Sequence, residues 1–407
     1  MGTFRNVSKA NPCPICGKPD WCSILIPDQP VYSGQKLYVC RRIQFPQVQS
    51  PDNGKTYYFV KELSDGSSLY TDVEKSEKKS KNEHGYCYRP SPKQPVADID
   101  YGIPPRPNIE LDAVYRDFLS MLPLSKKHSQ KMAADGWPLK LIKESQIHSL
   151  ALKKFYDNST GYFKDNIERY RICRQLLEKH SSLEGVPGFY QESSGQWTFV
   201  GKPGMLIPLY DMEGNLYRLR LRLDRPETDE NGKERNKYKN FSSYRESKDE
   251  NGVLSNAYLN GCRAKSHIGF YFHQERDDAS VCYITEGEKK AIIANYFLRH
   301  IVISLPGINS YSKLLEKNSF GKCALDFLAD IGCNSVVIAY DADKYVNKNV
   351  LRCEGKLAEL LTDASFPTYI ADWNPGFGKG LDDMLVLGVR PQLTEYRKSS
   401  AGNSSDT

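Results

Sequence analysis

Residues 278 to 390 alternate short apolar runs with segments of helical spacing, and this alternation restricts the fold more than any other feature of the sequence. The apolar runs are Val281–Thr285, Ile301–Ser304, Ser335–Tyr340 and Thr368–Ile370. Strands that alternate with helices usually form a parallel sheet, because each helix returns the chain to the same end of the sheet. We therefore expect an α/β unit with a mostly parallel sheet, whose strands end at one common edge.

Acidic residues follow these runs at three points. Glu286 ends the first run, and Gly287 lets the backbone turn sharply after it. Asp341 and Asp343 follow the third run, and a Gly-Leu-Asp-Asp sequence that contains Asp382 follows the fourth. A carboxylate at the carboxyl end of a parallel strand projects into the crevice where α/β folds place their sites. Two acidic groups at alternate positions can share one Mg²⁺ or Mn²⁺ ion.

Taken singly, each acidic residue is equally well explained as a solvated loop residue or, for Asp382, as a helix cap. Their succession is more specific. An E-G-x-x-K, a P-G, a D-x-D and a G-x-D-D follow one another, each at the end of an expected strand. We interpret this order as a divalent-metal site.

The same region resembles the Toprim domain, a metal-binding module shared by bacterial-type primases, topoisomerases, recombination-mediator proteins and some nucleases. The resemblance implies that Glu286 is the catalytic glutamate and that Asp341 and Asp343 are the D-x-D metal ligands. Asp382 matches the later catalytic acidic position, and the aspartate after it is a weaker match. Lys289 falls where these domains often carry a basic or polar helix residue, and we include it among the nucleotide-binding candidates.

Four of the eleven cysteines, Cys13, Cys16, Cys22 and Cys40, lie near the N-terminus. A C-x2-C followed by glycine forms a knuckle that supplies two zinc ligands, and the other two cysteines would complete a tetrahedral site with a β-hairpin between them. Four thiolates leave no open position, so we expect structural zinc. Four unrelated buried thiols are a weaker explanation, because so short a segment has no other means of making a core.

Asp20 and His84 are possible substitute zinc ligands. Small zinc ribbons commonly contact nucleic acid, and Trp21, Arg41 and Arg42 lie beside cysteines of the set. The remaining cysteines do not indicate a disulfide framework, because their total is odd and they are scattered. Small apolar side chains in a protein core are the simplest explanation of these residues, which include Cys173, Cys262 and Cys282.

The spacing of apolar residues changes twice in the middle of the chain. From about 109 to 185 apolar residues recur at helical spacing, first at Leu111, Val114, Phe118 and Leu122, then more loosely at Ile167, Tyr170, Leu176 and Leu177. From about 186 to 275 short strands with turn signals follow. The runs 205–210 and 216–223 flank the turn 211–214 and predict a hairpin.

The second strand of that hairpin places Arg218, Arg220 and Arg222 on one face at period two. Such a stripe can bind a template strand or triphosphate oxygens, although it can also be a solvated strand face. The hairpin and the later segment containing Lys237 and Lys239 resemble the core of bacterial-type primases. The lysine segment has a simpler explanation too, as a hairpin edge.

The order of these parts resembles that of bacterial replicative primases. We expect a zinc ribbon at 11–62, a polar linker at 63–108, a helical and basic strand module at 109–275, a Toprim domain at 276–392 and a disordered tail at 393–407. The cysteine spacing, the large helical segment and the lack of a helicase-docking domain after about 390 depart from the replicative enzymes. The chain looks closer to divergent primase-like proteins of phages, plasmids and integrative elements.

The resemblance implies an enzyme that makes short RNA primers from nucleoside triphosphates on single-stranded DNA by two-metal nucleotidyl transfer. A separate replicative helicase is a possible partner. The net charge of +6 and the pI near 8.6 suit an anionic partner. No run reaches the roughly 20 apolar residues of a membrane span and no signal core precedes the ribbon, so we expect a cytoplasmic protein.

Other functions remain open at this stage. A non-catalytic single-strand-binding replication accessory would keep the acidic residues for one structural ion, and a Toprim nuclease would use the same residues. A nuclease of the type that needs an ATPase would require a partner chain, because the sequence has no G-x-x-x-x-G-K-[ST] loop. A type I topoisomerase needs a large cleavage domain, for which the chain is too short. Recombination-mediator proteins are about half this size.

Overall fold

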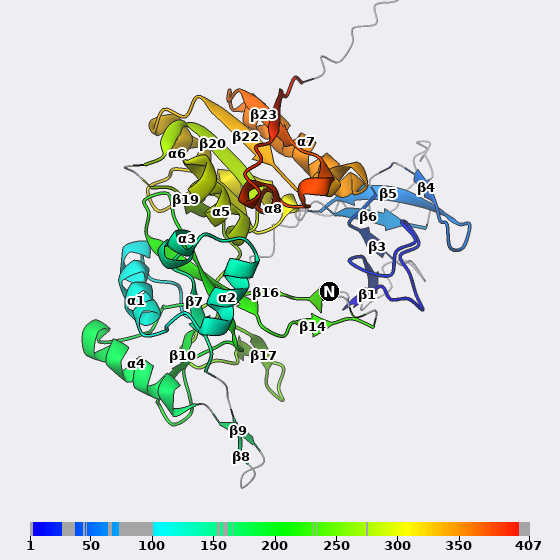
Figure 1. Ribbon diagram of the computed structural model, residues 1–407. Helices are drawn as coiled ribbons and strands as arrows, with labels where there is room; N and C mark the ends of the chain where they lie inside the picture. Colours follow the sequence, from blue (N-terminus) through cyan, green and yellow to red (C-terminus); the bar gives the residue numbers. More distant parts are fainter. Residues whose placement is uncertain are drawn as a thin grey trace, which may run out of the picture. The chain divides into compact units, whose positions relative to one another are not determined.

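The computed structural model describes residues 3–26, 37–43, 45, 47–63, 67–72, 101–152, 155–157, 162–164, 166–230, 232, 234–273 and 276–398. The chain divides into two compact units, one of residues 1–95 with 344–353 and one of residues 96–343 with 354–407 (Figure 1). Most of the predicted linker lies outside the described residues, and so does His84. The predicted domain boundaries otherwise stay a prediction.

The first unit contains a six-stranded antiparallel sheet in the order β1-β2-β3-β6-β5-β4. Its strands are β1 (Thr3–Asn6), β2 (Ser23–Ile26), β3 (Leu37–Cys40), β4 (Gln47–Gln49), β5 (Thr56–Glu62) and β6 (Ser68–Thr71). The pairing of β2 with β3 confirms the hairpin between Cys22 and Cys40. The boundaries 11 and 62 are too narrow for this sheet, because β1 and β6 lie outside them. Both strands have only four residues, too few for a clear alternation of apolar and polar side chains.

Three helices open the described part of the second unit, α1 (Asn108–Ser120), α2 (Lys126–Ala134) and α3 (Leu139–Glu144), and a fourth, α4 (Ile167–His180), follows after three short strands. As expected, α1 buries Leu111, Val114 and Phe118. The expected face of α4 is partly wrong, because Ile167 is 74% exposed. Asn166 caps α4, so Ile167 is its first residue, and the buried face starts at Arg169 instead.

A four-stranded antiparallel sheet follows in the order β16-β13-β12-β7. Its strands are β7 (His148–Leu150), β12 (Gly204–Tyr210), β13 (Leu216–Leu223) and β16 (Tyr238–Asn240). The antiparallel pairing of β12 with β13 confirms the predicted hairpin. Asp211 stabilises its turn, because the N–H groups of Glu213 and Asn215 donate to Asp211 Oδ1 at 3.0 and 2.8 Å.

Short two-stranded pairs complete this region: β8 (Phe155–Asp157) with β9 (Tyr162–Lys164), β10 (Phe189–Gln191) with β11 (Trp197–Phe199), β14 (Glu227–Thr228) with β15 (Glu234–Arg235), and β17 (Glu246–Lys248) with β18 (Leu254–Asn256).

The core that α1 and α4 share with β10 and β11 is rich in aromatic rings. Phe118 lies 5.0 Å from both Phe189 and Phe199, measured between ring centroids, and 5.6 Å from Phe241.

The last sheet has the order β19-β21-β20-β22-β23-β24. Its strands are β19 (Gly269–Tyr271), β20 (Asp278–Glu286), β21 (His300–Leu305), β22 (Ser335–Ala339), β23 (Thr368–Asp372) and β24 (Gln392–Glu395). The four inner strands pair in parallel, and β19 and β24 form antiparallel edges. Residues 393–395 therefore belong to a strand and not to a disordered tail. All of β24 is exposed, so it lacks the apolar pattern that marks a strand in a sequence. Residues 399–407 lie outside the described part.

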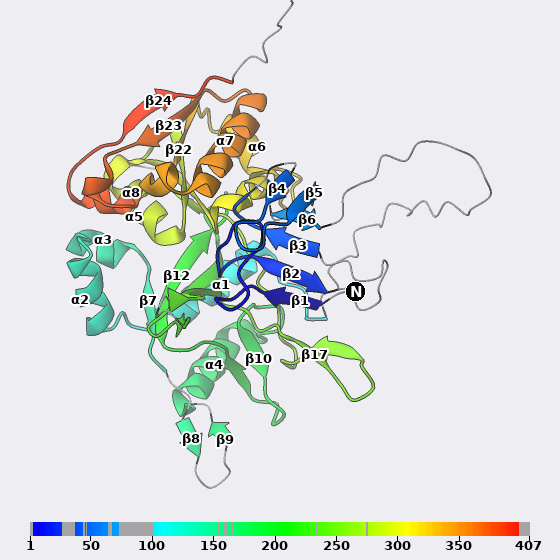
Figure 2. The same ribbon diagram turned by 90° about the vertical axis from the view of Figure 1, so that its right-hand side faces the viewer.

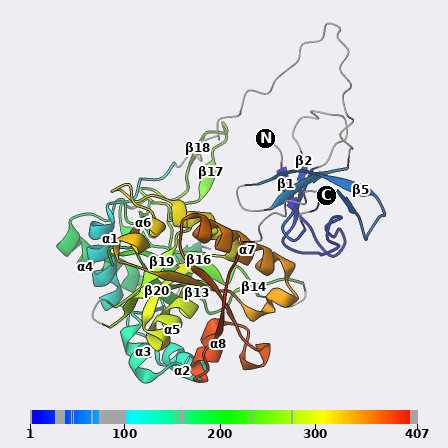
Figure 3. The ribbon, with the colours of Figure 1, turned by 90° about the horizontal axis from the view of Figure 1, so that it is seen from above.

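The helices of this α/β region are α5 (Glu288–Leu298), α6 (Ala324–Asp330), α7 (Lys348–Asp363) and α8 (Leu381–Val386), with short 3-10 turns η1 (Ile308–Leu315), η2 (Ala342–Tyr345) and η3 (Pro375–Phe377). Figure 2 shows α5 and α8 on one side of the sheet and α6 and α7 on the other. On the first side, α2 and α3 lie beside α5 and α8 (Figure 3), and Met132, Trp137, Ile292 and Met384 share one buried core.

Cys173, Cys262 and Cys282 are 1%, 0% and 0% exposed, which confirms that they are core side chains. Among the described helices, none has the length and apolar content needed to cross a membrane.

Candidate functional site

Two of the predicted acidic residues leave the sheet at neighbouring points. The strands β20 and β22 are parallel neighbours, and Thr285 pairs with Ala339 near their carboxyl ends. The Thr285 hydroxyl donates to the Ala339 carbonyl at 2.9 Å. Glu286 ends β20 and Asp341 follows β22, so both lie at the same edge. Gly287 has a φ of 87°, a value that suits glycine, and it turns the chain directly from the strand into α5.

Lys290 links this edge to the start of α8. Its Nζ forms an ion pair with Asp341 Oδ1, and the two side chains are only 21% and 12% exposed. Gly380 makes room for both charged side chains, because a Cβ at this position would lie 2.2 Å from Asp382 Oδ1 and 3.1 Å from Lys290 Cε. On the other side of the carboxylate, Lys379 Nζ lies 3.3 Å from Asp341 Oδ2. Both carboxylate oxygens of Asp341 therefore face a lysine.

A third carboxylate, that of Asp382, also influences Lys290. Burial favours the neutral amine, but the carboxylates of Asp341, Glu286 and Asp382 outweigh it and raise the pKa of Lys290. Burial also raises the pKa of Asp382, and Lys290 opposes that shift. Carboxylates from β20, from the residue after β22 and from α8 thus all act on the charge of one ammonium group, although among the described residues only the four N-terminal cysteines lie close enough together to form a metal-ligand cluster. An all-oxygen donor set of this kind fits Mg²⁺ or Mn²⁺.

The remaining predicted residues of this site divide into two groups. The side chain of Asp343 lies outside the described residues, although its backbone belongs to η2. Asp383 is exposed and accepts a hydrogen bond from the Gly380 N–H at 2.9 Å, so it caps α8. The carboxylate site therefore comprises Glu286, Asp341 and Asp382 among the side chains that the structure describes.

Lys289 was the predicted basic residue of this helix, and the structure gives it another environment. Its Nζ lies 3.3 Å from Asp135 and 5.5 Å from the centroid of the Trp137 ring. Burial lowers its pKa. The lysine that reaches the carboxylates is Lys290, the final residue of the E-G-x-x-K pattern, so the signal for it was present in the motif itself.

The arginine stripe on β13 lies next to this site and is not a solvated face. Arg218 is only 7% exposed. The Arg220 side chain is 16% exposed, and its Nη1 lies 3.2 Å from Glu288 Oε1. Glu288 is the first residue of α5, two positions after Glu286. The Arg220–Glu288 ion pair therefore joins β13 to the helix that follows the first site carboxylate.

The lysines of the predicted nucleotide-binding segment are paired locally. Lys237 Nζ lies 2.8 Å from Glu234 Oε2, and Lys239 Nζ lies 3.3 Å from Glu227 Oε1. Lys239 belongs to β16, the edge strand of its sheet, which agrees with the simpler explanation of the segment as a hairpin edge.

The four N-terminal cysteines form a compact cluster in the first unit. Their Sγ atoms all lie within 4.8 Å of one another, with 3.8 Å between Cys16 and Cys22 and 3.9 Å between Cys22 and Cys40. Zn–S bonds of about 2.3 Å in a tetrahedron place sulfur atoms about 3.8 Å apart. Gly17 has a φ of 67°, and its N–H donates to the Cys13 carbonyl at 2.7 Å, which closes the knuckle. The cluster therefore fits a structural zinc ion.

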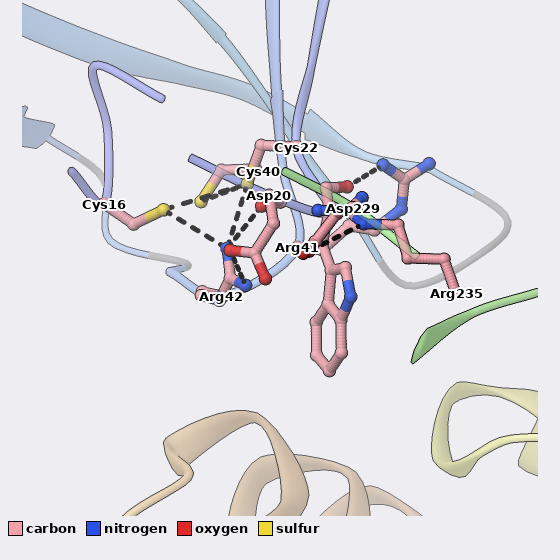
Figure 4. A network of polar contacts seen from close by, with 9 residues as sticks. Cys16, Asp20, Cys22, Cys40, Arg41, Arg42, Asp229 and Arg235 are labelled. Carbon is pink, nitrogen blue, oxygen red and sulfur yellow. Dashed lines mark hydrogen bonds and ion pairs between the residues drawn. The ribbon is translucent and has the colours of Figure 1, made fainter. Parts of the chain in front are cut away.

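Arg42 supports this cluster from outside (Figure 4). Its Nη1 lies 3.9 Å from Cys16 Sγ and 3.8 Å from Cys22 Sγ, close enough to offset thiolate charge. Its Nη2 lies 2.7 Å from Asp20 Oδ1, so Asp20 pairs with arginine and is not a ligand. The guanidinium carbon lies 4.9 Å from the centroid of the Trp21 ring, and Trp21 is 51% exposed.

Comparisons with known proteins cover part of the chain. Residues 271–390 match a family model described as a domain of unknown function, DUF3854. No curated protein matches the sequence.

Several solved structures resemble the fold, and they are catalytic cores of primases. The zinc-binding and RNA polymerase domains of the Aquifex aeolicus primase match at 12% identity and a TM-score of 0.42, over 70% of this chain and 62% of that chain. A DNA primase domain from Pseudomonas aeruginosa matches at 12% identity and 0.42, over 70% and 80%. The RNA polymerase domain of Mycobacterium tuberculosis primase DnaG, solved with double-stranded DNA, matches at 12% and 0.43, over 69% and 76%. At these identities and TM-scores, function has to be argued from the site itself.

The zinc assignment predicts a specific loss. The Cys40→Ser variant is expected to drop from about one zinc ion per chain to almost none, because a closed four-thiolate site loses a ligand. Inductively coupled plasma mass spectrometry of the dialysed protein measures the content. Cys333→Ser, which changes a cysteine outside the cluster, is the control and should keep its zinc. Full zinc occupancy in Cys40→Ser would contradict the assignment.

The lysine among the carboxylates predicts a metal-dependent stability change. In buffer without Mg²⁺ or Mn²⁺, Lys290→Met should lower the free energy of unfolding by about 3 kcal/mol, because it leaves buried carboxylates without their counter-charge. Added Mn²⁺ should restore much of that loss, since a bound cation replaces the ammonium. Thermal denaturation with and without Mn²⁺ measures both effects.

Lys322→Met is the matched control, because Lys322 pairs with Asp330 at an exposed position. It should show neither the loss nor the recovery. A destabilised Lys290→Met protein that does not respond to Mn²⁺ would argue against a cation site at these carboxylates.

Proposed function

We propose that this chain is a primase-type nucleotidyltransferase that makes short RNA primers on single-stranded DNA. The observation that carries the proposal is that Glu286 and Asp341 lie at one carboxyl edge of a parallel sheet, where Lys290 pairs with Asp341 and its pKa is raised by Asp341, Glu286 and Asp382. The proposal extends this set to Asp343, which the D-x-D pattern adds, and identifies the region as a Toprim domain.

These carboxylates would hold Mg²⁺ or Mn²⁺, which when bound neutralises triphosphate charge and aligns the attacking hydroxyl for in-line displacement. The protein's own contribution is to hold the donors in place. Lys290 and Lys379 face the two oxygens of Asp341 and restrict the orientation of its carboxylate. Glu286 ends β20 at the same edge of the sheet, directly before the turn at Gly287.

The basic strand would bind the phosphates of the incoming nucleotide. Glu288 holds Arg220 through an ion pair at 3.2 Å, so this guanidinium is positioned before any ligand arrives. Arg222 lies two residues further along the same strand and is half-buried. Lys237 and Lys239, each paired with a glutamate at a more exposed position, would contribute to binding the template backbone by long-range attraction.

The zinc ribbon would bind the single-stranded template. Trp21 is 51% exposed and rests against Arg42, so a base could stack on the exposed part of the indole while arginines contact phosphate. The zinc ion is structural in this proposal, because all four tetrahedral positions are taken by cysteines. We place the protein in the cytoplasm, in replication of a phage, plasmid or integrative element, with a helicase as a separate partner.

A single-strand-binding replication accessory without catalysis is the second candidate. The feature that favours it is the pair of lysines against Asp341, which supply positive charge where a catalytic metal would bind. A Toprim nuclease is a third candidate, since the same carboxylates could hold an ion that activates water.

A priming assay separates these candidates. The wild-type protein, incubated with an unprimed single-stranded template, labelled nucleoside triphosphates and Mn²⁺, is expected to yield short labelled RNA. Glu286→Gln and Asp341→Asn should reduce the yield at least about 100-fold, as expected when a group that stabilises transition-state charge is lost. Asp330→Asn, which changes an exposed aspartate of the same sheet domain, should retain normal activity.

Each alternative has its own outcome in this assay. Template binding without any product would support the accessory, and shortened template would support the nuclease. Equal product from wild type and both carboxylate variants would contradict the catalytic assignment.

A further inference from the structure

Arg218 is a buried cation for which the described part of the chain supplies no counter-ion. It is 7% exposed, and its one described hydrogen bond runs from Nη1 to the carbonyl of the adjacent Tyr217, at 2.6 Å. Its Nε has no partner, and no carboxylate pairs with it among the residues that the structure describes. A buried charge without a partner strongly destabilises a folded protein, so such a group is normally paired or binds a ligand.

Two other buried or half-buried arginines of this unit also have an Nε that forms no hydrogen bond with a described residue, but their remaining guanidinium nitrogens are better supplied. Arg169 is 0% exposed, and its guanidinium donates to the carbonyls of Phe199, Leu152 and Gly201 at 2.5 to 2.8 Å. Arg220, on the same strand as Arg218, pairs with Glu288. The chain therefore supplies acceptors to neighbouring buried arginines, and the different environment of Arg218 needs an explanation.

A second unpartnered group lies on the same aromatic ring. The Arg218 guanidinium carbon lies 5.1 Å from the Tyr217 ring centroid, and the His267 ring lies 5.4 Å from it. The Tyr217 hydroxyl donates to the Ile268 carbonyl at 2.6 Å, which fixes the tyrosine beside the histidine segment. The Nε2 atom of His267 is buried, and no described residue forms a hydrogen bond with it.

Two lysines, Lys265 and Lys313, also act on His267. Burial, together with the charges of Arg218, Lys313 and Lys265, lowers the pKa of His267 to about 3. Lys313 belongs to η1, the turn that follows the second strand of the parallel region, and its Nζ lies 2.8 Å from Glu316. Three separate chain segments thus bring positive charge toward this ring, and the carboxylates of Glu316, Asp211 and Glu288, which also act on Tyr217, offset part of that charge.

We propose that Arg218 and His267, with Lys265 and Lys313 around them, form a binding site for the terminal phosphates of a nucleoside triphosphate. A phosphate offers several acceptor oxygens, which suit the planar guanidinium and the unpaired imidazole nitrogen. The burial of Arg218 favours a terminal phosphate over a phosphodiester, because only a chain end can enter a site with so little exposure. The inference rests on the proposed function for its substrate class.

The Arg218→Met variant tests this site, because the inference predicts opposite effects on stability and on binding. Without anion, Arg218→Met should unfold at a higher temperature than wild type, since an unpaired buried charge is removed. Binding of sodium tripolyphosphate, measured by isothermal titration calorimetry without divalent ions, should weaken at least about tenfold, because charge-assisted hydrogen bonds are lost. His267→Gln is a second variant and should weaken binding while keeping the fold.

Arg169→Met is the matched control. It removes a buried arginine that already has three acceptors, so it should unfold at a lower temperature than wild type and retain normal tripolyphosphate affinity. A single-stranded oligonucleotide without 5′ phosphate, titrated in the same way, separates terminal phosphates from phosphodiesters and should bind Arg218→Met and wild type equally.

Two outcomes would overturn the inference. One is unchanged tripolyphosphate binding in both Arg218→Met and His267→Gln. The other is a loss of binding only for the oligonucleotide, which would assign the site to the DNA backbone. The tripolyphosphate titration uses neither metal nor template, so its result is independent of the priming assay. If the wild type makes primers but Arg218→Met does not change tripolyphosphate affinity, this phosphate site is rejected and the proposed function stands. If Arg218→Met weakens tripolyphosphate binding but the wild type makes no primers, the proposed function is rejected.

Discussion

The ion pair between Lys290 and Asp341 is the interaction on which the carboxylate site depends. Parallel pairing of β20 with β22 brings Glu286 and Asp341 to one edge, and α8 adds Asp382. Carboxylates crowded in a half-buried place repel one another and lose hydration, so the arrangement requires a cation. In this chain part of that charge is built in, because Lys290 lies among the three and Lys379 faces Asp341 from the other side.

The two units are stabilised in different ways. The second unit has extensive apolar cores, one of which is formed by Phe118 and the rings around it. The first unit has a small core in which cysteines pack with Tyr38, Tyr57 and Tyr70. A core of that size contributes little free energy of folding, and a zinc ion bound by four thiolates would supply what is missing. Arg42 would then offset the negative charge of the thiolates.

Much of this architecture could be predicted from residue patterns. The alternation of strands and helices indicated an α/β sheet, and the turn at Asp211 indicated the hairpin of β12 and β13. The cysteine spacing led to a cluster with the sulfur distances of a zinc site. In each case the signal is local or periodic. The strand β24 could not be found this way, because it is exposed and joins the sheet through its backbone.

The pairing of individual site residues could not be predicted from the sequence pattern. Lys289 and Lys290 are adjacent and chemically identical, and only the direction of each side chain from α5 decides which one reaches Asp341. The arginines of β13 alternate as predicted, yet the pattern could not show that Arg220 would be paired while Arg218 has no counter-ion among the described residues. Arg220 is paired because α5, which is distant in sequence, brings Glu288 to it.

The central claim is that the carboxylate edge takes a divalent cation, and anomalous scattering from crystals grown with Mn²⁺ tests it most directly. A crystal structure should show an anomalous peak bounded by Glu286, Asp341 and Asp382, with the Lys290 ammonium displaced from Asp341. The peak should be absent from crystals of Asp341→Asn. A map with Lys290 still paired to Asp341 and no peak at saturating Mn²⁺ would contradict the account.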